Sequence, residues 1–283
     1  MRLKVVALLG LFVCLNSCVT PSERIRAQAK SYAFEELELR GTDYRHVVFF
    51  KAGAGKNPRL HVYLEGDGSP WLDRDLISPD PTPKNPLMLS LMALDPNPAL
   101  YLGRPCYMGI PQSDPCEAGL WTHRRYSAEV VASMSAALKQ FLRIASYSEL
   151  AFLGHSGGGA LALLLAEQFP QTRAVVTLSG NLDTDAWTDY HGYERLVGSM
   201  NPANRNPLSP KVQELHYVGR EDQNVLPRFV RSRLKTNPGI EVKVVNGFNH
   251  TCCWQEIWPE ILERISQKQA ASVQISVPTI PKP

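Results

Sequence analysis

The segment LAFLGHSGGGALALLLAEQ, residues 150–168, restricts the fold of this chain more than any other part of the sequence. A short apolar run typical of a buried strand is followed at once by a longer apolar run of helical length. The junction holds one serine, Ser156, among four glycines. A very tight turn crowds the backbone, and Gly154 and Gly158 remove the Cβ atoms that would collide. The segment therefore predicts a sharp strand–turn–helix unit with the side chain of Ser156 pointing outward.

Strands and helices alternate from about residue 60 onward. The predicted strands are continuously apolar, as parallel strands covered on both faces are; they span 60–66, 98–103, 150–154, 174–180, 214–219 and 241–247. The predicted helices span about 86–94, 126–144, 157–168, 226–236 and 253–265. Two earlier runs, 33–39 and 46–50, predict an antiparallel hairpin. We therefore predict one α/β domain over residues 33–266, with a mostly parallel sheet, an antiparallel start and helices on both faces.

Composition agrees with a single large core and excludes one class of partner. The chain has 283 residues, of which 44% are hydrophobic, enough for one large domain. The formal net charge is only +3 and no dense Lys/Arg block is present, so nucleic acid is not an expected partner. The polar stretches 67–86 and 181–213 are predicted loops, and the polar, proline-containing tail 267–283 is predicted to be disordered.

The first 18 residues, MRLKVVALLGLFVCLNSC, have the three-part layout of an export signal. Their end, Leu15-Asn16-Ser17-Cys18, resembles the lipobox of bacterial lipoproteins. The resemblance implies removal of residues 1–17, acylation of Cys18 and a membrane partner reached through this lipid anchor, with 18–32 as a linker. Val19 after the cysteine implies the outer membrane of the cell envelope, facing the periplasm. An ordinary secreted or periplasmic protein cut nearby is the alternative.

Four cysteines remain in the exported domain, where disulfides can persist. Cys106 and Cys116 bracket a loop with glycine and proline, and we predict that they pair. The adjacent Cys252 and Cys253 could stay reduced, bond to each other or bond elsewhere, and the sequence leaves this open. No CxxC or HxxxH spacing is present, so no metal site is predicted.

The glycines after Ser156 also fit a dinucleotide-binding loop, because residues 157–162 read G-x-G-x-x-A. That motif needs an acidic residue at the end of the next strand to hold a ribose. Here the strand ends Leu178-Ser179-Gly180-Asn181, without an acid. The pattern therefore favours a nucleophilic serine, with the Gly157 N–H at a helix N-terminus as a donor to an oxyanion.

GHSGGG in this setting resembles the nucleophile elbow of the α/β-hydrolase superfamily, over about residues 45–265. The family order of serine, acid and histidine places the acid in GREDQNVLP, at Asp222, with Glu221 as its neighbouring substitute and Asp183 or Asp185 as fallbacks. It places the histidine at His250, in the loop before the last helix. His61 and His216 are predicted to be packed residues within strands, and His155 a support beside the serine.

The resemblance also implies a second oxyanion donor after the strand 60–66. Many family members have His-Gly there, whereas this chain has Glu65-Gly66 followed by Asp67, whose N–H is the expected donor. The aromatic residues Trp71, Tyr107 and Trp121 lie in loops that could line the substrate site.

The implied activity is transfer of an acyl group from a small-molecule carboxylic ester to water, without metal or organic cofactor. A peptidase or thioesterase would use the same triad. A non-catalytic envelope protein that uses the fold for binding or scaffolding is the rival from another class.

Overall fold

The computed structural model describes residues 19–54, 57–73, 75–110, 115–231, 233–236 and 239–273. The predicted signal segment 1–17 and the predicted lipidation site Cys18 lie outside these residues, as does the predicted tail from 274 onward. Among the described residues, no helix has both the length and the apolar character needed to cross a bilayer.

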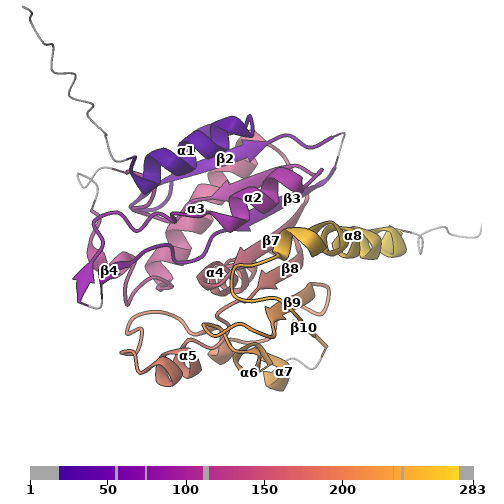
Figure 1. The fold of residues 1–283 in the computed structure, drawn as a ribbon. Helices are drawn as coiled ribbons and strands as arrows, with labels where there is room; N and C mark the ends of the chain where they lie inside the picture. The colour runs from indigo at the N-terminus through magenta and orange to yellow at the C-terminus, as the bar shows by residue number, and fades with distance from the viewer. Residues whose placement is uncertain are drawn as a thin grey trace, which may run out of the picture.

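An eight-stranded sheet forms the centre of the described chain, in the order β1-β2-β6-β3-β7-β8-β9-β10 (Figure 1). Its strands are β1 (Glu35–Arg40), β2 (Arg45–Lys51), β3 (Arg59–Leu64), β6 (Ala99–Leu102), β7 (Glu149–His155), β8 (Thr172–Leu178), β9 (Gln213–Gly219) and β10 (Glu241–Val245). β2 runs antiparallel to β1 and β6, whereas the other neighbouring pairs are parallel. The predicted mostly parallel sheet with an antiparallel start is confirmed.

Helices surround this sheet (Figure 1). They are α1 (Pro21–Ser31), α2 (Leu87–Leu94), α3 (Ala128–Ile144), α4 (Gly157–Ala166), α5 (Thr184–His191), α6 (Pro227–Arg231), α7 (Arg233–Thr236) and α8 (Trp254–Val273). α3 packs on β1, β2 and α4, whereas α2 packs on β3, β6 and α8. The buried core continues into α8, where Trp254 and Trp258 have no exposed surface. The core therefore joins the central sheet to the last helix.

Two segments predicted as loops contain regular structure. Residues 67–86 include a separate two-stranded sheet of β4 (Trp71–Asp73) and β5 (Leu76–Ile77). The polar stretch 181–213 holds α5 and a 3₁₀ turn, Pro202–Asn204. α5 begins where the Asp183 carboxylate accepts a hydrogen bond from Ala186 N at 3.1 Å, and it ends at Gly192, whose φ is +66°. Capping side chains rather than apolar periodicity define this helix.

The segment 18–32, which we predicted to be a linker, instead carries α1 packed on the domain. Thr20 and Glu23 form a capping box at its start, and Pro21 occupies its first turn. Ile25 and Ala29 are buried at 0% and 1% exposure. At the other end of the chain, α8 continues to Val273, beyond the boundary at 266 that we predicted for the domain.

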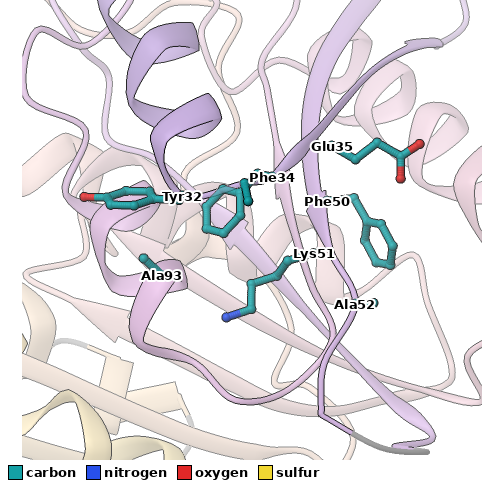
Figure 2. Close-up of a pocket in the computed structure, with 8 residues that line it drawn as sticks. Tyr32, Phe34, Glu35, Phe50, Lys51, Ala52 and Ala93 are labelled. Carbon is teal, nitrogen blue, oxygen red and sulfur yellow. The ribbon is translucent and has the colours of Figure 1, made fainter.

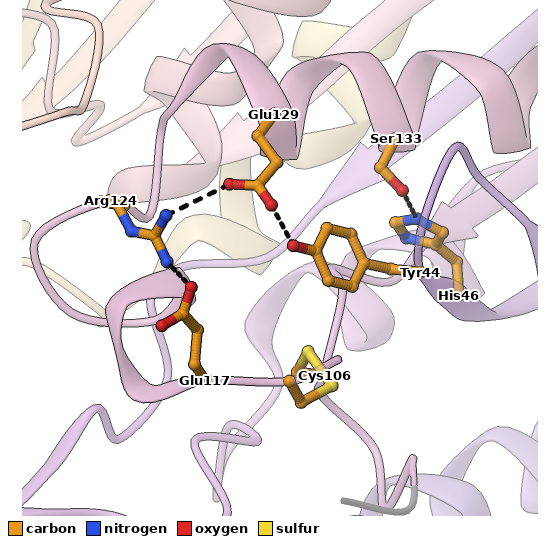
Figure 3. Close-up of a disulfide and its surroundings, with 8 residues drawn as sticks. Tyr44, His46, Cys106, Glu117, Arg124, Glu129 and Ser133 are labelled. Atoms are coloured by element: carbon orange, nitrogen blue, oxygen red, sulfur yellow. Dashed lines mark hydrogen bonds and ion pairs between the residues drawn. A yellow bond between two sulfur atoms is a disulfide. The ribbon is translucent and has the colours of Figure 1, made fainter. Parts of the chain in front are cut away.

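Cys106 and Cys116 form the predicted disulfide, with an S–S distance of 2.08 Å. Figure 3 shows it below two side-chain clusters that tie α3 to the sheet. In one, the His46 ring lies between Gly103 O at 2.9 Å and Ser133 Oγ at 2.8 Å. Burial lowers the pKa of His46 to about 4, so this histidine is a neutral packing residue. Cys252 and Cys253, whose pairing the sequence left open, are bonded to each other.

We expect Ile25→Ala to lower the free energy of unfolding by about 2–4 kcal/mol, because it removes a fully buried side chain and leaves a cavity under α1. Arg24→Ala changes an exposed side chain on the same helix and should cost less than about 0.5 kcal/mol. Urea unfolding followed by circular dichroism measures both. Equal, small effects would mean that α1 does not contribute to the folded domain.

Candidate active site

Ser156 lies at the sharp turn between β7 and α4. Its backbone has φ +53° and ψ −121°, a strained conformation for a residue with a side chain. A Cβ at Gly154 would lie 2.2 Å from Gly158 O, and one at Gly158 would lie 2.1 Å from Leu64 O. The turn therefore requires glycine at both positions, as the sequence predicted. It leaves Ser156 at the N-terminus of α4, where the Gly157 N–H has no carbonyl within the helix to accept it.

The structure brings the three predicted side chains together from three separate loops. Ser156 Oγ lies 3.0 Å from His250 Nε2, and His250 Nδ1 lies 2.9 Å from Asp222 Oδ2. The second oxygen of Asp222 accepts hydrogen bonds from the backbone of Asn224 at 2.8 Å and Val225 at 2.9 Å. These bonds fix the carboxylate, which holds the His250 Nδ1–H and leaves Nε2 to accept the serine proton.

Asp222 is suited to remain ionised beneath His250. Asp222 is only 2% exposed to solvent. Burial by itself would raise the pKa of the carboxyl, but the hydrogen bond and charge of His250 outweigh it and hold the pKa below its usual range. Glu221, the alternative acid, is exposed. Asp183 caps α5, and Asp185 forms an ion pair with Arg195 at 2.8 Å, so the fallback acids have other partners.

His155 supports the loop that carries His250. Its Nε2–H donates to the backbone carbonyl of His250 at 2.8 Å, and the two rings have centroids 4.8 Å apart. Burial, reinforced by the neighbouring His250, lowers the pKa of His155 to about 3. His155 is therefore neutral at ordinary pH and acts as a hydrogen-bond donor rather than as a second base.

Asn224 is a site residue that the sequence reasoning missed. Its side-chain amide nitrogen lies 3.1 Å from His250 Nε2, the same atom that faces Ser156. Its amide oxygen accepts a hydrogen bond from the indole N–H of Trp187 in α5, at 3.1 Å. Because an indole nitrogen only donates, this bond fixes the orientation of the amide and directs its NH₂ group to His250. No motif pointed to this residue, although it lies two positions after Asp222.

The predicted oxyanion loop lies directly over the serine turn. A Cβ at Gly66 would lie 3.5 Å from Ser156 Cβ, and a Cβ at Gly157 would lie 1.9 Å from Asp67 Oδ1. Asp67 and Gly157, the two predicted donors, are therefore neighbours across the site. The Tyr107 hydroxyl donates to Asp67 O at 3.0 Å and holds the backbone of this loop in place.

The side chain of Asp67 is held by two arginines that the sequence reasoning did not single out. Arg104 Nη1 lies 2.9 Å from Oδ1, Arg125 Nη1 lies 2.8 Å from Oδ2, and the Tyr126 hydroxyl donates at 2.7 Å. Burial would raise the pKa of Asp67, but Arg125 and Arg104 lower it to about 2. The three charges (−1, +1 and +1) sum to +1, so a positive cluster lies beside the predicted oxyanion donors.

Glu65, which stands where many members of the α/β-hydrolase superfamily have histidine, is bonded to the start of α2. Its Oε2 accepts a hydrogen bond from Met88 N, in the first turn of α2, at 2.9 Å. Burial raises the pKa of Glu65 to about 7, although the backbone N–H groups of Gly66 and Met88 oppose the shift. This carboxyl anchors α2 behind the loop, and its Oε1 lies 4.0 Å from His155 Nδ1.

The three aromatic residues predicted to line the substrate site differ in their exposure. Trp71 is 43% exposed on the β4–β5 hairpin. Tyr107 is buried against Asp67 O, and the Trp121 indole donates to Ser78 O at 3.1 Å. Tyr107 and Trp121 therefore hold the 67–78 loop through hydrogen bonds to its backbone. Of these three aromatic side chains, only Trp71 is exposed to solvent.

An open cavity of about 460 Å³ lies elsewhere in the fold, between β1, β2 and α2. Figure 2 shows its lining, with the Lys51 side chain extending past the ring of Phe34 toward Ala93. The Lys51 amine donates to the backbone carbonyl of Met92 at 3.2 Å, at the C-terminal end of α2. None of the residues that line this cavity belongs to the Ser156 site. Among the described residues, no cluster of three or more potential metal ligands is present.

Comparison with known proteins identifies the fold. Residues 108–247 match the family model described as the alpha/beta hydrolase fold, a span that contains Ser156 and Asp222. An esterase from Pyrococcus furiosus superposes with a TM-score of 0.59 at 14% identity, covering 86% of this chain and 93% of its own. An esterase/lipase from an uncultured bacterium superposes with a TM-score of 0.56 at 13% identity, covering 91% of this chain and 94% of its own.

A third solved structure, an α/β serine hydrolase without a lid from Xanthomonas campestris, gives a TM-score of 0.53 at 12% identity and covers 88% of this chain and 97% of its own. A search of curated proteins finds no match. The chain therefore has the α/β-hydrolase fold that its sequence predicted.

The Asp67 cluster predicts a specific dependence of stability on pH. The pKa of this carboxyl falls from 3.8 to about 2 on folding, so its contribution is present above about pH 5 and is lost as the pH falls toward 2. A shift of this size corresponds to about 2 kcal/mol. Asp67→Asn should cost about 3–5 kcal/mol at pH 7, because it leaves two buried guanidinium groups without their carboxylate.

Between pH 5 and pH 2 the difference in unfolding free energy between wild type and Asp67→Asn should narrow by about 2 kcal/mol. Denaturant titrations at these pH values measure it. Asp73→Asn, an exposed carboxylate in the following hairpin, is the control. If this difference in unfolding free energy stayed constant between pH 5 and pH 2, the arginines would not be lowering the pKa of Asp67.

Proposed function

We propose that this chain is a serine hydrolase that cleaves carboxylic esters through an acyl-enzyme. The observation that carries the proposal is the continuous hydrogen-bonded chain from Ser156 through His250 to Asp222, at the β7–α4 turn of an α/β-hydrolase fold. The similarity to solved esterases and serine hydrolases supports the same class of reaction.

In this mechanism Ser156 Oγ attacks the ester carbonyl carbon while His250 Nε2 takes the hydroxyl proton. Asp222 keeps the Nδ1–H in place and stabilises the imidazolium that forms. The proton then passes to the leaving alcohol, and water repeats the sequence to release the acid. The N–H groups of Gly157 and Asp67 receive the oxyanion, each contributing about 3 kcal/mol of transition-state stabilisation. The net positive Asp67–Arg104–Arg125 cluster favours negative charge at that position.

The N-terminal sequence leads to a second part of the proposal. We place the mature protein in the bacterial envelope, attached through a lipid on Cys18, because the segment 1–18 resembles a lipoprotein signal. Mass spectrometry of the N-terminal peptide from the expressed protein tests this. An acylated Cys18 supports it, whereas a free N-terminus elsewhere would replace it with simple secretion.

Ser156→Ala should lower kcat/KM for short p-nitrophenyl esters by at least about 10³-fold, because no other group on the site can form the acyl-enzyme. A fluorophosphonate probe should label the wild type at Ser156 and leave the variant unlabelled. Thr184→Ala, which removes a hydroxyl in the first turn of α5, outside the triad, is the control. Hydrolysis and labelling that persist in Ser156→Ala would exclude this mechanism and favour a non-catalytic role for the fold.

Asn224→Asp should move the acid limb of the kcat/KM profile upward by about one pH unit. The new carboxylate would stabilise a proton on His250 Nε2, whereas the native amide NH₂ opposes it. Asp can still accept the Trp187 N–H, so the change is electrostatic and the variant should fold. The pH–rate profiles of wild type, Asn224→Asp and Asn224→Ala measure it, and an unmoved acid limb in the aspartate variant would contradict the assigned contact.

A further inference from the structure

The β4–β5 hairpin exposes an unusual amount of apolar surface for its size. Trp71, Leu72, Leu76 and Ile77 are 43%, 55%, 57% and 37% exposed. They make up four of the eleven large hydrophobic side chains that are exposed among the described residues. The hairpin forms its own two-stranded sheet, separate from the central one. Contiguous exposed apolar side chains of this kind mark a contact surface rather than a folding requirement.

The base of this hairpin is firmly tied to the body of the protein. Ser69 N donates to Pro81 O and Ser78 N donates to Pro70 O, both at 2.9 Å. The Trp121 indole adds a hydrogen bond to Ser78 O at 3.1 Å. These bonds close the hairpin at its base, and its apolar strand residues remain exposed. Figure 1 shows β4 at the edge of the molecule.

The hairpin also begins at the edge of the Ser156 site. Trp71 follows the oxyanion loop residue Asp67 by four positions, and four residues of extended chain span at most about 14 Å. Asp67 in turn lies against Gly157, beside the nucleophile. A surface that binds the hairpin would therefore lie close to Ser156.

The start of α1 is attached to this hairpin. Ser22 Oγ donates to Asp80 Oδ2 at 2.7 Å and lies 3.2 Å from Thr82 Oγ1, in the segment that follows the hairpin. Cys18 precedes Ser22 by four residues, so the N-terminal segment outside the structure joins the domain here. Figure 1 shows the start of α1 and β4 on the same side of the molecule.

We propose that the β4–β5 hairpin docks on a lipid bilayer surface and presents Ser156 to an ester held in that bilayer. The proposal rests on the hydrolase function proposed above and names its substrate class, an amphiphilic ester with its acyl chain in the membrane. Trp71, Leu72 and Leu76 enter the membrane–water interface, where tryptophan side chains are enriched. In the sequence, the run Asp73-Arg74-Asp75 has a formal charge of −1, which favours zwitterionic over anionic headgroups.

The test compares two esters with the full chain and its Leu72→Asn/Leu76→Asn variant. One substrate is p-nitrophenyl acetate in solution, and the other is a p-nitrophenyl ester of a long fatty acid embedded in phosphatidylcholine vesicles. We expect the variant to hydrolyse the vesicle substrate about tenfold more slowly, because two apolar contacts with lipid are lost. Its rate on the acetate should equal that of wild type.

Matched variants separate the hairpin from general surface effects. Ile144→Asn/Val197→Asn changes two side chains that are 73% and 72% exposed elsewhere, and it should leave both rates unchanged. Leu72→Met/Leu76→Met keeps the apolar character and should retain vesicle activity. Thermal unfolding establishes that all variants are folded. Equal rates on vesicles, or equal losses on both esters, would overturn the proposal.

A second measurement does not depend on hydrolysis. Vesicles of bromine-labelled phosphatidylcholine should quench the tryptophan fluorescence of wild type, and Trp71→Phe should remove most of that quenching. If wild type hydrolyses neither ester, the proposed function fails. The quenching measurement then tests by itself whether the hairpin binds the bilayer. Quenching that is absent or unchanged in Trp71→Phe overturns the docking. A concentration-dependent dimer that Leu72→Asn/Leu76→Asn abolishes would instead assign the hairpin to a second copy of the chain.

Discussion

The close approach of backbone atoms at the β7–α4 turn is the constraint on which the site depends. The turn brings Gly158 within van der Waals contact of Gly154 and of the Leu64 carbonyl, with no room for a Cβ at either glycine. This contact pulls the end of β3 against the start of α4. As a result, Ser156 and the loop after β3 lie together, although about 90 residues separate them in the chain. The strained φ of Ser156 is maintained because the surrounding β-strands are buried on both faces.

The mostly parallel sheet with its antiparallel start and the three hydrogen-bonded side chains could be predicted from the sequence, whereas the order of the strands in the sheet was not. Continuous apolar runs define the parallel strands, and the order of Ser156, Asp222 and His250 follows the strand ends. The helices α1 and α5 could not be predicted from apolar periodicity because both are mostly polar, and the apolar strands of the β4–β5 hairpin are only three and two residues long. Capping signals were nevertheless present, as Thr20-Pro21-Ser22-Glu23 before α1 and Asp183 before α5.

The site residues that escaped prediction act on other groups rather than on a substrate. Asn224 has a role only because Trp187 fixes its amide and His250 lies opposite, and both contacts depend on the tertiary fold. The same holds for Arg104 and Arg125, which a sequence shows only as two of 30 basic residues. Sequence order identifies groups that follow strand ends, whereas it says nothing about which buried charges will meet. Tyr107 and Trp121 were predicted to line the substrate site, whereas their polar groups donate hydrogen bonds to Asp67 O and Ser78 O and hold that loop.

Asp67 links the chemistry of the site to the surface around it. Its backbone is the proposed oxyanion donor, its carboxylate binds Arg104 and Arg125, and the exposed hairpin begins four residues later. Because Asp67 has all three roles, a shift of this residue would disturb both the loop over Gly157 and the base of the hairpin. The ion pairs are buried, and the Tyr126 hydroxyl donates a further hydrogen bond to Asp67, so they resist such movement more than an exposed pair would. The geometry that positions a donor for the oxyanion therefore also fixes where a docked surface must lie relative to Ser156.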